Sequence, residues 1–165
     1  MTQTTLADLM ATIPQVGRVT WIGLRPQRNA TITAVDSVLA CSNQGLVGDR
    51  YAGRTGKRHV TLIQAEHLPV LASLLNIPEC RPEQLRRNIA VSGLNLLALK
   101  DKEFLIGDAH LRYTGLCHPC SRMEAIFGAG GYNALRGHGG ITAQVLGGGE
   151  IAIGSAIRAL QNRTD

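Results

Sequence analysis

Short apolar runs, many of them alternating with polar residues and bounded by Gly, Pro, Asn or Asp, dominate the hydrophobic pattern of this 165-residue chain. Such runs are typical of β-strands, because successive side chains in a strand point to opposite faces of the sheet. The pattern predicts strands at Val16–Leu24, Ala34–Ala40, Val60–Ile63 and Asn88–Val91. Long helical periodicity is rare, so the chain favours a sheet-rich fold.

Two segments have helical features. Leucines recur at helical spacing along one face from about Gln64 to Leu75, and Pro69 in this segment is tolerable only near the first turn. Pro82–Leu85 begins with the residue that is favoured at the first position of a helix, which predicts a short helical turn.

Two further segments resemble each other. Glu103–Arg112 and Glu150–Arg158 each read as an apolar strand, a Gly-Asp or Gly-Ser turn and a second strand, the pattern of a tight hairpin. Sharp turns of this kind favour a barrel or a sandwich. No solenoid repeat or low-complexity linker divides the chain, so we expect one domain over residues 1–165, with its core at about 16–158.

The composition, 44% hydrophobic and 18% charged residues, is that of a folded globular protein. No apolar stretch approaches the ~20 residues that a membrane span needs. The N-terminal segment contains Asp8 and no basic start, so it does not resemble a signal peptide. These features predict a cytoplasmic protein without a membrane partner.

The formal charge of +5 favours an anionic partner. Basic residues cluster at Arg50–His59, which includes Arg54, and at Arg86–Arg87. Proteins that read single-stranded nucleic acid interleave aromatic with basic residues, and Tyr51 is the only aromatic residue in these runs. We therefore expect no nucleic-acid partner. Each cluster is either a solvated loop face or, more specifically, a phosphate site.

The four cysteines are expected to be free thiols, and the isolated Cys41 and Cys80 are interpreted as small apolar fillers. Cys117-His118-Pro119-Cys120 is the strongest local signal, because it follows a strand and precedes a segment that can start a helix. Unpaired N–H groups at a helix N-terminus favour a thiolate, and Arg122 would act in the same direction.

Three structural interpretations of this motif remain open. A structural zinc site needs about four ligands, and the chain has one cysteine pair with His118 and His138 as helpers. A thioredoxin-like redox pair has this spacing, but it normally follows the first strand of a βαβ unit. The third interpretation is a turn that contains two buried thiols.

Two other segments carry chemistry. Arg86-Arg87-Asn88 opens a predicted strand with two guanidinium groups and an amide, which suit a phosphate or the edge of a heterocycle. Gly45–Arg50 contains glycines that permit close approach, and Asp49 in it could brace an arginine.

Together these segments form an ordered set of motifs. They read GLVGDR (45–50), RHVTLIQAEHL (58–68), RRNIAVSGLNL (86–96), FLIGDAHL (104–111), CHPCSRME (117–124) and GGITAQV (139–145). No single motif is decisive, but the set and its order resemble the MOSC domain family, which is similar to the C-terminal part of molybdenum-cofactor sulfurases. The resemblance covers roughly Val16 to Ile157.

The resemblance implies an α+β fold that is mostly β, a β-barrel-like domain with a few short helices. It also implies a domain that binds the molybdenum cofactor or handles its sulfur. The functional cysteine of the family corresponds to Cys120, as the catalytic residue and molybdenum ligand or as a carrier of activated sulfur. Arg86 and Asn88 match residues that bind the pterin and its phosphate, and Asp49 and Arg50 match the G-D-R turn. The remaining expected cofactor-binding residues are Arg87, Lys57 and His118.

Strand alternation adds that one of the two arginines faces the cleft and the other faces solvent, and the family pattern selects Arg86 for the cleft. No role is assigned to Gln64 or Glu66. The chain has no room for a pyridoxal-phosphate desulfurase domain, so we expect no pyridoxal phosphate. It also lacks a G-x-G-x-x-G fingerprint and iron–sulfur spacing, so a separate electron-donor or sulfur-donor protein is expected.

Three functions follow from the resemblance. The first is a molybdenum-cofactor-binding oxidoreductase component that reduces N-hydroxylated compounds. The second is a sulfur carrier in which Cys120 bears a persulfide, and the third is a non-catalytic cofactor carrier. The sequence does not specify the substrate, the donor protein or the oligomeric state.

Overall fold

The structure, a computed structural model, describes residues 3–50, 53 and 55–161. Tyr51 and Arg54 of the basic run therefore lie outside the described residues. The strands are β1 (Gly17–Leu24), β2 (Thr33–Ala34), β3 (Ser37–Cys41), β4 (Gly45–Leu46), β5 (Val60–Gln64), β6 (Ile89–Ser92), β7 (Glu103–Ile106), β8 (Ala109–Leu116), β9 (Ile141–Gly147), β10 (Gly149–Ala152) and β11 (Ala156–Ala159). The helices are α1 (Leu6–Ala11), α2 (His67–Leu75), α3 (Pro82–Leu85), α4 (Ser121–Phe127), α5 (Gly131–Leu135) and the 3-10 helix η1 (Leu96–Leu99).

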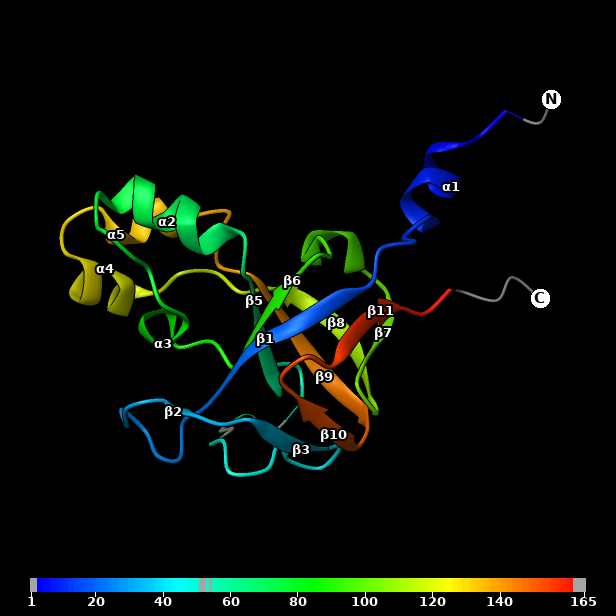
Figure 1. Cartoon of the computed structure of the whole chain (residues 1–165), viewed down its shortest axis with the longest axis horizontal. Helices are drawn as coiled ribbons and strands as arrows, with labels where there is room; N and C mark the ends of the chain where they lie inside the picture. The colour runs from blue at the N-terminus through cyan, green and yellow to red at the C-terminus, as the bar shows by residue number, and fades with distance from the viewer. Residues whose placement is uncertain (1–2, 51–52, 54, 162–165) are drawn as a thin grey trace.

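Seven strands close into a barrel in the order β11-β7-β8-β9-β5-β6-β1, and the pairing of β1 with β11 completes the circle. β5 and β6 pair in parallel, and a parallel pair needs a long crossover connection. That crossover carries α2 and α3, which lie beside α4 and α5 at one end of the barrel (Figure 1). β10, β3 and β4 form a small second sheet. The expected mostly β, barrel-like fold with a few short helices is confirmed.

The core has two parts that meet at β5, a strand in which every residue is buried. Leu62 belongs to the barrel cluster, together with Ile22, Phe104 and other apolar residues. Its neighbour Ile63 points to the opposite face and packs in a second cluster with Leu71 and other residues beneath the helices. Because both faces of β5 are covered, its apolar residues do not alternate with exposed polar ones, and its two polar residues, Thr61 and Gln64, are buried as well.

Most expected elements are present, with shifted ends. The helix predicted from Gln64 begins at His67, because Gln64 is the last residue of β5. The predicted strand Ala34–Ala40 is interrupted, with only β3 and the two-residue β2 on either side of the break. The turn predicted at Pro82–Leu85 is α3.

One of the two predicted hairpins is wrong. β7 and β8 pair across Gly107-Asp108 as expected. β10 instead pairs with β3, while β11 pairs with β7 and β1, so the segment Glu150–Arg158 passes from one sheet to the other. The local turn signal was real, because the Ser155 amide donates to the Ala152 carbonyl. The partner of each strand, however, is set by tertiary contacts.

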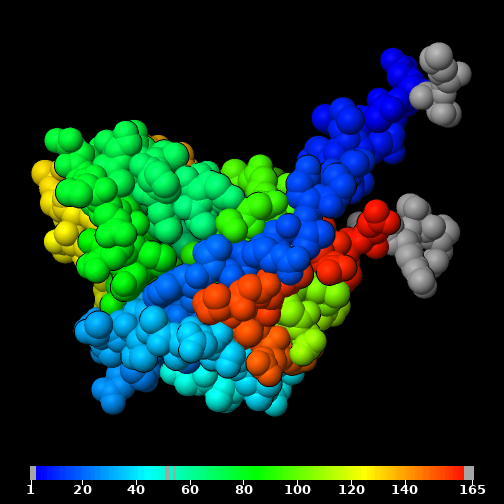
Figure 2. Space-filling view, viewed as in Figure 1, coloured from blue at the N-terminus to red at the C-terminus, as the bar shows by residue number. Residues whose placement is uncertain are grey.

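The N-terminal helix α1 projects from the barrel and has no buried residue (Figure 2). Within the described part of the chain, no helix combines the length and apolar character needed to cross a membrane.

Candidate functional site

The Arg86-Arg87 pair lies where α3 ends and β6 is about to begin. Arg86 is the C-cap of α3 and has a left-handed backbone, with φ of 57°. A non-glycine residue in this conformation is uncommon, and it turns the chain sharply. The side chains of Arg86 and Arg87 consequently enter different surroundings.

Arg86 lies in a cleft of about 260 Å³. The lining residues are Arg25, Gln27, Arg28, Asn29, Arg50, Arg86 and Arg122, and we call this site the arginine cleft. Five of its seven lining residues are arginines, and none is acidic. Asn29, like Arg86, has a positive φ, of 62°. Strained backbone of this kind is concentrated at functional sites, so its recurrence in one cleft favours a binding role.

Asp49 lies beneath the cleft and pairs with Arg25. Its Oδ2 is 3.0 Å from Arg25 Nη2, and its side chain is 1% exposed. Asp49 Oδ1 also accepts the Arg25 backbone N–H at 2.7 Å. The expectation that Asp49 braces an arginine is confirmed, and the partner is Arg25, which the sequence reasoning missed.

The positive charges of the cleft act on one another. The pKa of Arg86 is lowered, mainly by burial and then by the nearby charges of Arg122 and Arg25. An ionised Cys120 and the Asp49 carboxylate act in the opposite direction. Among the described residues, the Arg86 guanidinium donates only to the Ala30 carbonyl, at 3.1 Å. An anion in the cleft would relieve this crowding of cations.

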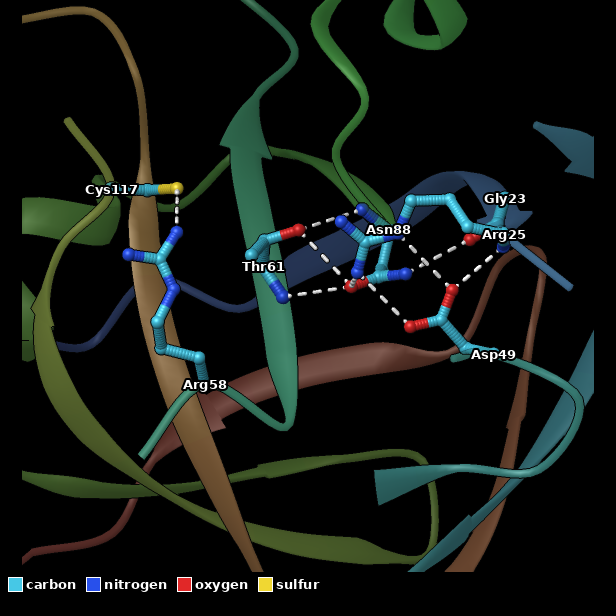
Figure 3. A network of polar contacts seen from close by, with 7 residues as sticks. All are labelled: Gly23, Arg25, Asp49, Arg58, Thr61, Asn88 and Cys117. Carbon is cyan, nitrogen blue, oxygen red and sulfur yellow. Dashed lines mark hydrogen bonds and ion pairs between the residues drawn. The ribbon is translucent and has the colours of Figure 1, made fainter. Parts of the chain in front are cut away.

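Asn88 is fully buried and joins three strands (Figure 3). Its Oδ1 accepts from the backbone N–H and the hydroxyl of Thr61, at 3.0 and 3.1 Å, and its Nδ2 donates to the Gly23 carbonyl at 3.2 Å. Arg25 Nη2 also lies 3.5 Å from Asn88 Oδ1. The amide therefore supports the floor of the cleft through Arg25 and does not line the cleft itself.

Arg87 is 7% exposed, so the prediction that it faces solvent is wrong. Its guanidinium donates to the carbonyls of Gly139, Leu85 and Cys117, at 2.8, 2.9 and 3.5 Å. The left-handed turn at Arg86 directs Arg87 inward, where these carbonyls need donors. Burial lowers the pKa of Arg87, and the nearby Cys117 and Cys120 thiols oppose that shift.

The two cysteines of the CHPC motif have different surroundings. Cys117 is buried, and Arg58 Nη2 approaches its Sγ at 3.7 Å, on the opposite side of β5 from the Asn88 network (Figure 3). Cys120 is exposed and is the N-cap of α4, two residues before Arg122 of the cleft. Both thiols are free, as are those of Cys41 and Cys80. Burial raises the pKa of Cys80 to about 11, which fits the filler role expected for it.

The structure also bears on the open interpretations of the motif. Among residues 3–50, 53 and 55–161, no three His, Cys, Asp or Glu side chains gather as a metal site, so this part of the chain lacks the ligand set of a structural zinc site. The exposure of Cys120 excludes a turn with two buried thiols.

Several expected residues lie outside the cleft lining. Lys57 and His118 are exposed at other positions of the surface. Gln64 and Glu66 make structural contacts, because they accept the backbone N–H groups of Leu96 and Gly93. The cleft arginines that the sequence reasoning missed are Arg25 and Arg28. Their signal was the run Arg25-Pro-Gln-Arg-Asn29 directly after β1.

Comparisons with known proteins agree with this geometry. The family model described as the MOSC domain matches residues 41–158. The YuaD protein from Bacillus subtilis superposes with a TM-score of 0.76 and 19% identity, over 88% of this chain and 97% of that one. YiiM from Geobacillus stearothermophilus gives 0.69 and 15%, over 90% and 77% of the two chains. YiiM from Escherichia coli gives 0.68 and 17%, over 90% and 72%.

At these identities the structural neighbours establish the fold alone. No curated protein sequence matches the chain. The family model, in contrast, spans most of the sequence, including the segments that carry Asp49, Arg86, Asn88 and Cys120. This chain therefore belongs to the MOSC domain family, which is associated with the molybdenum cofactor.

Proposed function

We propose that the chain binds the molybdenum cofactor, with the pterin phosphate in the arginine cleft and the Cys120 thiolate as a ligand of the metal. The observation that carries the proposal is a cleft lined by five arginines and no acid, beside an exposed thiol. Guanidinium groups bind phosphate through paired, charge-assisted hydrogen bonds, and a thiolate is a soft ligand suited to such a metal.

The residues present fit the cofactor. Arg86 has a free face toward the cleft, and Arg122 brings positive charge from the first turn of the helix that Cys120 caps. Asn88 and Asp49 accept hydrogen bonds from the Arg25 guanidinium and so hold this side chain in position at the cleft. Arg87 acts from inside, because its bonds to the Gly139 and Cys117 carbonyls join the loop that precedes Cys120 to the protein core.

In this proposal the protein is the cofactor-binding component of a reductase for N-hydroxylated compounds, supplied with electrons by a separate protein. The cofactor, when bound, supplies the redox chemistry. The chain itself binds the anion, presents a thiolate and leaves the site open to solvent at Cys120. The exposure of Cys120 also favours a second candidate, a carrier that bears activated sulfur on this thiol and delivers it to a metal centre.

Metal and pterin retention tests the proposal. The protein, purified from a host that makes the cofactor, is expected to contain molybdenum and a pterin in equal amounts. Cys120→Ala should lose the molybdenum, whereas Cys117→Ala should retain most of it, because Cys117 lies in the interior. A wild-type protein with persulfide on Cys120 and no pterin would support the sulfur carrier instead. Equal loss of molybdenum from both variants would contradict the assignment of Cys120.

A further inference from the structure

The CHPC motif carries two thiols that differ in their access to solvent. Cys120 is exposed, whereas Cys117 is 2% exposed. Residues 117–120 belong to no helix or strand and connect β8 to α4. Three peptide units separate the two cysteines, so their Cα atoms lie at most ~11 Å apart. The proposed function employs Cys120 alone, which leaves Cys117 as a nucleophile close to it in the chain without an assigned role.

The surroundings of Cys117 include two cations. Arg58 Nη2 lies 3.7 Å from Cys117 Sγ (Figure 3), and Arg87 Nη2 lies 3.5 Å from the Cys117 carbonyl oxygen. Cys80, in contrast, packs in the apolar cluster beneath the helices, and burial raises its pKa to about 11. Reactive cysteines are typically found beside cationic groups, whereas buried structural ones are inert. In its charged neighbours, Cys117 therefore resembles a reactive thiol.

The motif is anchored at both ends and has space on its inner side. The Cys117 N–H donates to the Gly140 carbonyl at 2.8 Å, and the Cys120 carbonyl accepts the Met123 N–H at 2.9 Å. A cavity of about 100 Å³ adjoins the motif, and its lining includes Cys117, His118, Pro119, Gly137, Gly139 and Gly140. A disulfide needs Cα atoms about 4.4–6.8 Å apart. The segment that must adjust to join the two sulfurs is thus the short link His118-Pro119.

We propose that the CHPC motif is a thiol–disulfide exchange pair whose substrate is a low-molecular-weight disulfide. The Cys120 thiolate attacks one sulfur of this substrate, which forms a mixed disulfide and releases the first thiolate. The Cys117 thiolate then attacks Cys120 Sγ, so the bond between the two cysteines forms and the second thiolate leaves with the electron pair. The two cysteines lose two electrons, the substrate is reduced to two thiols, and the cysteine protons pass to those thiols.

The difference in access sets the order of the two steps. A disulfide in solution meets the exposed Cys120 first, because Cys117 is buried. Once the mixed disulfide has formed, the short link between the cysteines gives the Cys117 thiolate a high effective concentration at Cys120. The exchange does not require the cofactor. Its oxidised product lacks the thiolate that the proposed function assigns to the metal.

Oxidised glutathione, added to protein made in a host without the cofactor, tests the proposal. Free thiols are blocked in acid at timed intervals, and the protein is digested with trypsin. The tryptic peptide of residues 113–122 contains Cys117 and Cys120 and no other cysteine. In the wild type this peptide should become two hydrogens lighter, which identifies the internal disulfide. In Cys117→Ser a glutathione adduct on Cys120 should persist at least about tenfold longer than in the wild type.

Two further variants act as controls. Cys120→Ser should leave Cys117 largely unmodified, because its thiol is buried. Cys41→Ser removes a partly exposed thiol outside the motif and should not alter the reaction of the peptide. A wild-type peptide that keeps the glutathione adduct without closing to the internal disulfide would overturn the inference, as would a peptide that glutathione does not modify at all. Neither result concerns molybdenum retention, so this failure is distinguishable from failure of the proposed function.

Discussion

Arg86 and Arg87 are consecutive in the chain, yet they belong to two regions with opposite character. Arg86 belongs to the arginine cleft, where cations crowd together and an exposed thiol lies nearby. Arg87 belongs to a buried polar region in which nearly every donor has an acceptor within the protein, together with Asn88 and Cys117. The comparison indicates that a buried guanidinium whose donors all bond to the protein contributes to stability. Guanidinium groups that gather at a cleft without acidic partners indicate a ligand.

The largest difference between the two regions is expected when each arginine is replaced by alanine. Arg87→Ala leaves three buried carbonyls without a donor, and each such group costs about 1–3 kcal/mol. We expect the free energy of unfolding to fall by at least about 3 kcal/mol in urea titrations. Arg86→Ala, the matched control, should change it by less than about 1 kcal/mol. Similar losses from both variants would mean that the two regions do not differ as described.

The reactivity of the two cysteine thiols gives a second comparison of the same regions. Cys120 is exposed, whereas Cys117 is 2% exposed beneath Arg58. Iodoacetamide should label Cys120 in the native protein at least about a hundredfold faster than Cys117, because a buried thiol reacts only after local opening. Peptide mass spectrometry over time measures both rates. Comparable rates would place Cys117 at the surface.

The smallest expected effect concerns His59, another buried polar residue. Its Nδ1 accepts the Val145 N–H at 3.2 Å, and burial lowers its pKa. The unfolded chain therefore binds a proton more readily than the folded one. Stability should be complete above about pH 6.5 and should decline as the pH falls below that value. His59→Gln, which keeps an acceptor, should flatten this slope, and an unchanged slope would assign the effect to other groups.

Much of the fold was predictable from local pattern. The β7–β8 hairpin has its turn residues at Gly107-Asp108, and β5 contains the closely spaced apolar residues Val60, Leu62 and Ile63. The pairing of β10 was not predictable, because the turn after Ala152 has the same local signals whether the chain folds back or changes sheet. Closure of the barrel through β1 and β11 likewise depends on residues far apart in the chain.

Residues of the candidate site were predictable only where they belong to a recognisable sequence motif. The cleft position of Arg86 and the bracing role of Asp49 were predicted from spacing and resemblance, and the role of Cys120 stays a prediction. The surroundings of Arg87 were mispredicted, because strand alternation was applied at a residue that follows a left-handed turn, before β6 begins. Arg25 and Arg28 were missed because their segment has no recognised motif and joins the cleft only through the fold.

In the proposed function, Arg86 binds the phosphate of the pterin cofactor. The most direct test measures the dissociation constant of the phosphorylated pterin for the wild type, Arg86→Ala and Arg158→Ala. A charge-assisted contact of about 1.5–3 kcal/mol predicts that Arg86→Ala weakens binding roughly tenfold to a hundredfold. Arg158→Ala, outside the cleft, should bind as the wild type does. Equal affinities for all three proteins would contradict the assignment of the arginine cleft.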